Sequence, residues 1–246
     1  MAQALYDYWF VQFDFPDENG KPYKSSGGRM VWNEKLKREI PEDWGIDNIT
    51  AIADIEGGGT PSTHEPLYWD GLIPFYTPKD ASDGFIAPSQ TLRNTTALGV
   101  THSSTKIFTN AVFLTARGTV GKVQMPRVAM AMNQSCYALL PKESISLFYL
   151  FFVVKGIVRA LKVKANGAVF DAIVTRDILG ILLPQAKSSV ISLFTETVAP
   201  ILSRIFANQS ELEELTKQRD FLLPLLMSGQ VQVKPQGELN YHLAAD

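Results

Sequence analysis

Cysteine and histidine are scarce in this sequence, which has one cysteine and three histidines in 246 residues. Cys136 has no second cysteine with which to form an internal disulfide, and its apolar neighbours predict an inert core thiol. His64, His102 and His242 are spaced too far apart to form a recognisable metal-ligand motif. We therefore expect no metal site and no disulfide within the chain.

The motifs of several enzyme classes are missing. The glycine-rich turn at residues 56–63 (EGGGTPST) lacks the Gly-Lys-Ser/Thr ending that places a lysine on nucleotide phosphates. The sequence has no G-x-G turn between a clear strand and a helix, no Asn-Pro-Pro-aromatic motif, no Glu-x-Lys pair and no G-x-S-x-G elbow. These absences favour a binding protein over an enzyme and predict no catalytic residue.

Long hydrophobic runs are also lacking. Crossing a bilayer takes about 20 apolar residues, whereas the longest run, Ile145 to Val154, contains Ser146 and ends at Lys155. The residues after Met1 do not have the basic start or the small cleavage-site residues of a signal peptide. We expect a buried helix at this run and a cytoplasmic protein with no membrane partner.

The net charge of −2 hides an uneven distribution of charge. Residues 101–170 contain nine basic residues and one acidic residue, a balance of +8, whereas residues 45–100 contain two basic and seven acidic residues, a balance of −5. Such a basic stretch predicts a surface that binds a polyanion such as nucleic acid. The alternative is that these charges are scattered over several faces.

The first third of the sequence alternates between short elements and turns. Residues 4–15 (ALYDYWFVQFDF) predict the last turns of a helix followed by an extended aromatic stretch, and Pro16 ends it. Residues 17–28 predict a loop, and residues 33–39 predict a short charged helix that Ile40 and Pro41 end. Trp44 then marks the start of the next domain.

The middle of the sequence is rich in predicted strands. Short apolar runs separated by turn signals predict strands at 49–55, 72–76, 111–116, 129–140 and 178–183. One longer helix is predicted at 144–164. Strands with one packed helix indicate an α+β, or mixed α/β, domain, and the irregular spacing argues against internal repeats.

A long helix is predicted at residues 185–228, where turn residues almost vanish. At 1.5 Å per residue this helix would be about 66 Å long. Apolar residues recur at alternating gaps of three and four, which predicts a coiled-coil seam in which Asn208 fixes the register and partner number. Alternatively, the helix packs on its own domain and Asn208 faces water. The seam residues are Ile201, Ile205, Asn208, Leu212, Leu215, Arg219 and Leu222.

Two prolines fall within this predicted helix. We expect Pro200 to bend it and Pro224 to disrupt its last turn.

Several blocks in this order resemble the target recognition domain of specificity subunits from Type I restriction-modification systems. The blocks are IPEDW (40–44), GGGTPST (57–63), YWDGLIPFYTPKD (68–80), FLTARGTVGKV (113–123), MNQSCYAL (132–139) and KANGAVFDAI (164–173). Residues 218–233 (QRDFLLPLLMSGQVQV) resemble the close of the family's long conserved helix. Residues 182–194 (LLPQAKSSVISLF) depart from the family's proline-rich turn and glutamine motif, which leaves the start of that helix open.

The resemblance implies four regions. Residues 1–43 would be the tail of a conserved helix plus a linker, 44–184 the target recognition domain, 185–230 the spacer and dimerisation helix, and 231–246 a C-terminal tail. Family subunits have two recognition domains and two long helices, whereas this sequence resembles one of each. The resemblance therefore implies a half-subunit or the C-terminal half of a longer chain.

The resemblance also implies a division of labour. This chain would bind double-stranded DNA without catalysis or a cofactor of its own. Modification (methyltransferase) subunits would methylate adenine, and a restriction subunit would translocate and cut DNA, with S-adenosylmethionine, ATP and Mg on these partners. A second recognition half would come from homodimerisation or from a longer chain.

Reading duplex DNA needs phosphate contacts for position and base contacts for sequence. Basic side chains suit phosphates, arginine also suits guanine, and the amides of Asn133 and Gln134 suit adenine. Each charge could instead be solvated, and each amide could cap a strand. The candidate DNA-binding residues are Thr60, Ser62, Thr77, Lys79, Lys106, Arg117, Lys122, Asn133, Gln134, Lys164 and Asn166.

Two other functions remain open at the level of sequence. One is an interaction or scaffold protein that uses the long helix and does not bind DNA, and the other is a divergent stand-alone DNA methyltransferase or nuclease. A gel shift with duplex DNA tests the first, and cofactor binding by the isolated chain would support the second.

Overall fold

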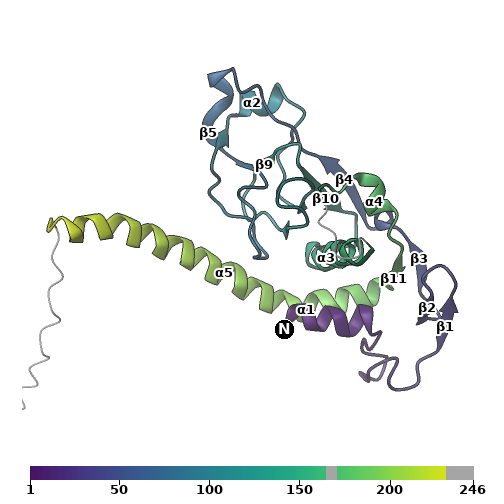
Figure 1. Ribbon diagram of the computed structural model, residues 1–246. Helices are drawn as coiled ribbons and strands as arrows, with labels where there is room; N and C mark the ends of the chain where they lie inside the picture. Colours follow the sequence, from purple (N-terminus) through teal and green to yellow (C-terminus); the bar gives the residue numbers. More distant parts are fainter. Residues whose placement is uncertain (165–170, 231–246) are drawn as a thin grey trace, which may run out of the picture. The chain divides into compact units, whose positions relative to one another are not determined.

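The computed structural model in Figure 1 describes residues 1–164 and 171–230. The chain divides into two compact units, Met1–Ser203 and Arg204–Asp246. The first unit holds every strand of the described chain and the helices α1 to α4. Helix α5 (Ser188–Met227) contributes residues to both units.

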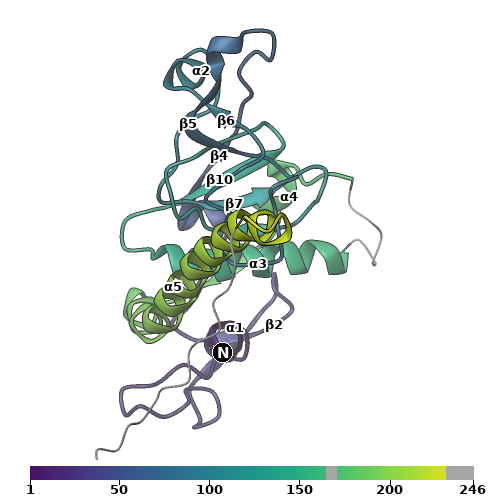
Figure 2. The same cartoon turned by 90° about the vertical axis from the view of Figure 1, so that its left-hand side faces the viewer.

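An antiparallel sheet of four strands forms the centre of the first unit. Its strand order is β4 (Ala53–Gly57), β10 (Cys136–Pro141), β7 (Val112–Thr115) and β8 (Val123–Gln124). Helix α3 (Leu147–Lys164) packs against β7, β8 and β10, and Figure 2 shows this helix beside β7 and β10. All four residues of β7 are buried, because both faces of this strand are covered, which explains its apolar run Val112–Leu114.

A second sheet orders β6 (Asn94–Thr95), β5 (Trp69–Tyr76) and β9 (Ala131–Met132), with β5 and β9 parallel. A short helical turn (Pro66–Tyr68) precedes β5, and helix α2 (Ala97–Thr101) follows β6. The hydroxyl of Thr96 caps α2 by accepting a hydrogen bond from the N–H of Gly99 at 3.0 Å. Threonine suits this position because its oxygen satisfies a donor that the helix leaves unpaired.

The N-terminal helix packs between two others. Helix α1 (Ala2–Tyr6) continues as a π-helix (Asp7–Val11), so the expected helical start is present. The ring of Phe10 lies 5.0 Å from that of Phe194 in α5 and 4.9 Å from that of Tyr149 in α3. Tyr6 stacks on Phe152 of α3 at 5.5 Å. Aromatic burial therefore joins α1, α3 and the start of α5.

The prediction of a short helix at residues 33–39 was wrong. The chain instead forms a hairpin of β1 (Met30–Asn33) and β2 (Arg38–Pro41). The side-chain oxygen of Asn33 accepts hydrogen bonds from the N–H groups of Lys35 and Leu36, both at 3.1 Å, and Lys37 has a positive φ of 52°. The asparagine thus stabilises a turn in competition with a helix.

Three of the expected strands differ in detail. The run at 49–55 begins with a helical turn (Ile49–Ala51) before β4, and the run at 129–140 divides into β9 and β10. The expected strand at 178–183 was wrong, because Thr175–Leu179 form helix α4 and only β11 (Leu183–Gln185) is extended. The carboxylate of Asp177 accepts a hydrogen bond from the N–H of Val174 at 2.9 Å, which caps α4.

Strand β11 pairs with β3 (Gly45–Asp47), with Pro184 opposite Ile46. This ladder holds together the two chain segments at residues 45–47 and 183–185.

The long helix is present close to its expected bounds. Pro200 and Pro224 both lie within α5, and the helix continues past Pro224 to Met227. The residues that α5 buries all lie in the first unit: Val190, Ile191, Phe194, Val198 and Leu202. This part of the helix therefore packs on its own domain, as one of the two sequence alternatives proposed.

One 18-residue window of α5 has a mean hydropathy of 1.5, so by length and composition alone this helix could cross a membrane. Polar residues interrupt the apolar residues of this helix, so the lack of a long unbroken apolar run in the sequence did not predict such a window. Its apolar content has a packing explanation in the first unit, where Phe194 contacts the rings of Tyr6, Trp9 and Phe10. Because 28% of this window is buried, packing in the first unit explains part of its apolar content.

Candidate nucleic-acid interface

Four loops from different strands meet at one edge of the first unit. They follow β4 (residues 57–60), follow β5 (77–80), follow β7 (116–121) and join β9 to β10 (133–135). We call these four segments the loop cluster. Loops held by a rigid scaffold are the usual carriers of binding residues.

The β4 loop approaches the β9–β10 loop very closely. The N–H of Gly59 donates to the carbonyl oxygen of Met132 at 3.1 Å. A Cβ atom on Gly58 would lie 2.6 Å from the carbonyl carbon of Asn133 and 2.7 Å from the oxygen of Met132. Glycine is therefore required at position 58 because the two backbones touch, which gives the sequence GGG a structural reason.

Backbone hydrogen bonds attach the other two loops. The N–H of Asn133 donates to the carbonyl oxygen of Tyr76 at 3.0 Å. The N–H of Arg117 donates to the carbonyl oxygen of Ser135 at 3.2 Å. The hydroxyl of Thr119 donates to the carbonyl oxygen of Pro78 at 2.6 Å. All four loops are thus fixed relative to one another.

The loop cluster brings together several of the predicted polar residues. The Thr60 hydroxyl donates a hydrogen bond to the side-chain oxygen of Gln134. The side-chain oxygen of Asn133 accepts from the N–H of Ser135 at 3.1 Å, which is the strand-capping arrangement given as the alternative for this amide. Ser62 lies farther along the first loop, where its carbonyl oxygen accepts from the indole N–H of Trp69 at 2.9 Å.

Asp80 organises the β5 loop, and sequence reasoning missed it. One carboxylate oxygen of Asp80 accepts from both the N–H and the hydroxyl of Thr77, at 2.9 and 2.6 Å. The other oxygen accepts from the N–H of Leu92 at 2.8 Å. The Thr77 hydroxyl is therefore engaged within the loop, whereas the side chain of Lys79 is exposed.

Ion pairs neutralise two of the predicted basic residues. Lys106 pairs with Glu56 at 2.9 Å, and Lys122 pairs with Asp83. Neither Lys79 nor Arg117 forms an ion pair within residues 1–164 and 171–230, and both are exposed. Arg117 and Lys79 are the two exposed cations of the loop cluster.

Sequence reasoning also missed three basic residues on one side of α3. Lys155, Arg159 and Lys162 are spaced i, i+4 and i+7, and this spacing places them on one helix face. The signal was present in the sequence, because the helix was predicted at 144–164. Lys164, a candidate from the sequence, is exposed at the end of α3. The candidate Asn166 lies outside the described residues.

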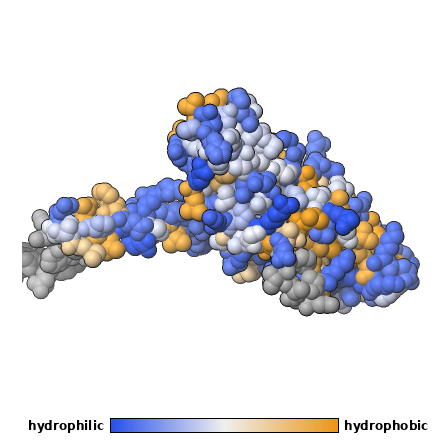
Figure 3. Space-filling model, turned by 45° about the horizontal axis from the view of Figure 1, so that its top comes forward, coloured by the Kyte–Doolittle hydropathy of each residue, from blue (hydrophilic) through white to orange (hydrophobic). Residues whose placement is uncertain are grey.

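The predicted seam residues of α5 lie on both sides of the unit boundary. Ile201 and Ile205 are half-buried, and Asn208 is exposed. In the second unit Leu212, Leu215 and Leu222 expose 58%, 53% and 43% of their surface, and Figure 3 shows apolar surface on this part of the helix. Arg219 is bonded to its neighbour Asp220 at 2.6 Å.

The lone cysteine lies in the core beneath the loop cluster. Cys136 is 1% exposed and packs with Tyr76 and Met132. Burial, followed by the nearby charge of Asp80, raises the pKa of this thiol to about 12. The thiol is therefore protonated and unreactive at neutral pH.

Comparison with known families gives a clear match. Residues 41–219 match the family described as "Type I restriction modification DNA specificity domain". The Type I restriction enzyme MjaIX specificity subunit of Methanocaldococcus jannaschii is 34% identical over 133 residues, which is 52% of this chain and 31% of that protein. The HindI specificity subunit of Haemophilus influenzae is 25% identical over 196 residues, or 78% and 42%. The chain spans less than half the length of these relatives.

Solved structures show the same fold. The HsdS subunit from Thermoanaerobacter tengcongensis superposes with a TM-score of 0.53 at 16% identity, over 87% of this chain and 47% of that chain. The S subunit of a Type I restriction-modification system from M. genitalium gives a TM-score of 0.54 at 16% identity, over 77% and 46%. The predicted fold class, a mixed α/β domain followed by a long helix, is confirmed.

Proposed function

Since this chain belongs to the family of Type I restriction modification DNA specificity domains, we propose that it recognises a sequence in double-stranded DNA through the loop cluster. The observation that carries this proposal is the convergence of four loops on a rigid sheet. Their separate hydrogen bonds hold polar side chains in a fixed geometry, which direct recognition of base edges requires.

Individual residues have different roles in this proposal. Arg117 contacts a phosphate or forms a bidentate pair with guanine, and Lys79 contacts the DNA backbone. The free amide group of Asn133 and the amide of Gln134 face bases, with Thr60 orienting Gln134. Lys106 and Lys122 contribute less than the sequence suggested, because each already has a carboxylate partner.

The chain supplies recognition in this proposal and its partners supply chemistry. Modification subunits would methylate adenine with S-adenosylmethionine, and a restriction subunit would use ATP and Mg to translocate and cut DNA. The chain itself would have no catalytic residue and would act in the cytoplasm with no membrane partner.

A second recognition half completes the proposed arrangement. The half would come from a second copy of this chain or from a longer polypeptide, and α5 would be the spacer that pairs the two. The recognised sequence should then be bipartite with a fixed gap. In a homodimer the two halves should be inverted copies, because two-fold symmetry relates the two readers.

Arg117→Ala tests the interface directly. We expect the variant to lower duplex affinity and to reduce the slope of log K against log salt by about 0.9, the contribution of one phosphate. Arg29→Ala is the control for loss of an exposed arginine elsewhere, because Arg29 has an 82% exposed side chain, lies before β1 and pairs with Glu42 at 3.3 Å. Unchanged affinity and slope for Arg117→Ala would remove this residue from the interface.

The function as a whole is tested by co-expression with the modification subunit and mapping of methylated adenines across a genome. A gapped palindrome indicates a homodimer, and a gapped asymmetric site indicates a second, different half. The proposal fails if the complex methylates without sequence preference or if the chain does not shift duplex DNA.

A further inference from the structure

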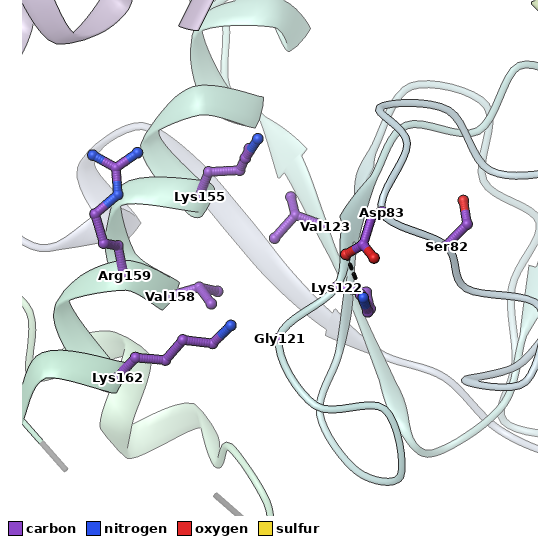
Figure 4. Close-up of a pocket in the computed structure, with 9 residues that line it drawn as sticks. All are labelled: Ser82, Asp83, Gly121, Lys122, Val123, Lys155, Val158, Arg159 and Lys162. Atoms are coloured by element: carbon purple, nitrogen blue, oxygen red, sulfur yellow. Dashed lines mark hydrogen bonds and ion pairs between the residues drawn. The ribbon is translucent and has the colours of Figure 1, made fainter. Parts of the chain in front are cut away.

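A cavity of about 270 Å³ lies between α3 and the chain segments at residues 82–83 and 121–123. Four of its lining residues are basic: Lys122, Lys155, Arg159 and Lys162. Figure 4 shows the three α3 residues on one side of the cavity and Lys122 with Asp83 on the other. No residue of this set other than Lys122 was a candidate from the sequence.

Local geometry places the Lys162 side chain against Gly121 in the lining of the cavity. Gly121 has a positive φ of 83°, and a Cβ atom there would lie 3.5 Å from Cε and 3.8 Å from Nζ of Lys162. The lysine head therefore packs over the bare backbone of Gly121. A side chain at position 121 would be strained and would also crowd Val158, at 3.0 Å.

The cavity has an excess of positive charge. Asp83 is its one acidic lining residue, and the hydrogen bond from Lys122, then the charge of Lys122 and a smaller effect of Lys162, lower the pKa of Asp83. Arg159 pairs at 3.4 Å with Asp7, which lies outside the lining set. Four cations therefore share two carboxylates.

The charged form of Lys155 is destabilised in this cavity. Its ammonium lies 4.8 Å from the centre of the Phe85 ring, and its pKa is lowered by burial first and by the like charge of Arg159 second, with Asp7 acting in the opposite direction. An anion in the cavity would offset both the desolvation of the Lys155 ammonium and its repulsion from Arg159.

We propose that this cavity binds a phosphate group. Lysine ammonium groups bind phosphate as compact point charges, and three of them line one concave site here. The loop that carries Arg117 leads through Gly121 to Lys122, so a DNA strand held at Arg117 can place a backbone phosphate in the cavity. This DNA source of the phosphate rests on the proposed function, and such a contact adds affinity without choosing a sequence.

Two substitutions of opposite effect test the cavity. Lys162→Gln removes one cation, and Asp83→Asn removes a carboxylate whose side chain is 91% exposed and which competes with an incoming anion. Lys35→Gln is the matched control, because Lys35 is an exposed lysine in the turn between β1 and β2. Binding of each purified variant to a short duplex of random sequence is measured by fluorescence anisotropy over a range of salt.

We expect Lys162→Gln to bind the duplex about fivefold more weakly near physiological salt, with a slope lower by about 0.9. Asp83→Asn should bind more tightly than the parent, and Lys35→Gln should match the parent. The map of methylated adenines should keep the same sequence in all three variants, because phosphates carry no sequence information.

Inorganic phosphate provides an independent arm. Thermal unfolding is followed in sodium phosphate and in sodium chloride of equal ionic strength. Phosphate should raise the Tm of the parent and of Lys35→Gln, and should raise that of Lys162→Gln less, because only a folded site that binds the ion gains stability from it.

The two arms separate the outcomes. If Lys162→Gln both binds the duplex more weakly and gains less Tm from phosphate, the site takes a DNA phosphate. If Lys162→Gln gains less Tm from phosphate but binds the duplex as the parent does, the site takes free phosphate. The proposal is overturned if Lys162→Gln behaves like Lys35→Gln in both arms. If the parent binds no duplex at all, the proposed function fails, and the inorganic arm still decides whether the cavity binds phosphate.

Discussion

A methyl group at position 58 should separate the β4 loop from the β9–β10 loop. In Gly58→Ala the new Cβ atom would lie 2.6 Å from the carbonyl carbon of Asn133 and 2.7 Å from the oxygen of Met132. Real Cβ atoms do not approach other atoms within 3.0 Å, and backbone atoms cannot rotate away as a side chain can. Gly58 does not have a positive φ, so the collision alone causes the loss.

The expected size follows from two contributions. Overpacking in a closely packed site lowers the free energy of unfolding by about 1–3 kcal/mol. Opening the contact also weakens the hydrogen bonds from the N–H groups of Gly58 to Cys136 and of Gly59 to Met132, at 3.2 and 3.1 Å, each worth about 1 kcal/mol. We expect a total loss of about 2–4 kcal/mol and a fall in Tm of roughly 5–15 °C.

Gly57→Ala is the matched control, because a Cβ atom on Gly57 has nothing within 4 Å. Its stability should be unchanged or higher by up to about 1 kcal/mol, since alanine has less freedom than glycine in the unfolded chain. Urea denaturation followed by tryptophan fluorescence measures both variants, and anisotropy with duplex DNA should show weaker binding by Gly58→Ala alone. Equal urea midpoints for the two variants would refute the close approach of the loops.

Three further predictions concern other parts of the chain. Gln124→Leu should lower the free energy of unfolding by about 2–4 kcal/mol. The Tyr76 hydroxyl and the Ile86 carbonyl, each hydrogen-bonded to Gln124 at 2.7 Å, would be left unpaired in the core. An unchanged midpoint in urea denaturation would contradict this. Cys136, with its pKa raised to about 12, should resist a thiol reagent at pH ~8 until the protein unfolds, and rapid labelling of native protein would show otherwise. Asn208→Leu should change the oligomer mass in analytical ultracentrifugation, and an unaltered mass would count against the seam.

The elements predicted best from sequence are those whose apolar pattern is long or unbroken. Helix α3 (Leu147–Lys164) lies within its expected range of 144–164, and α5 begins three residues after its expected start at 185. Strand β7 is buried on both faces, and its first three residues, Val112–Leu114, form an apolar run. Helix periodicity and complete burial both leave a strong local signal, because the apolar residues that pack the core then lie within a few positions of one another in the sequence.

Elements that depend on a turn, or on pairing with a strand distant in sequence, were predicted less well. The hairpin of β1 and β2 depends on the turn that Asn33 stabilises and on the positive φ of Lys37, and a charged segment of this length also suits a helix. Strand β9 has two residues, and its pairing with β5 joins Phe75 to Ala131 across a long stretch of chain. Such pairing is set by tertiary contacts, which no short window of sequence contains.

The charged residues show why a charge sum over a long segment and the spacing of charges within one helix differ in predictive value. The acidic stretch at 45–100 and the basic stretch at 101–170 are separate in sequence, yet folding pairs Lys106 with Glu56, 50 positions away, and Lys122 with Asp83, 39 positions away. The balance of +8 therefore overstated the cationic surface, because the folded structure decides which charges meet. The i, i+4, i+7 spacing of the α3 cations is fixed by helix geometry wherever the helix packs. A short periodic pattern of charge thus predicts a cationic face better than a larger sum over a long segment.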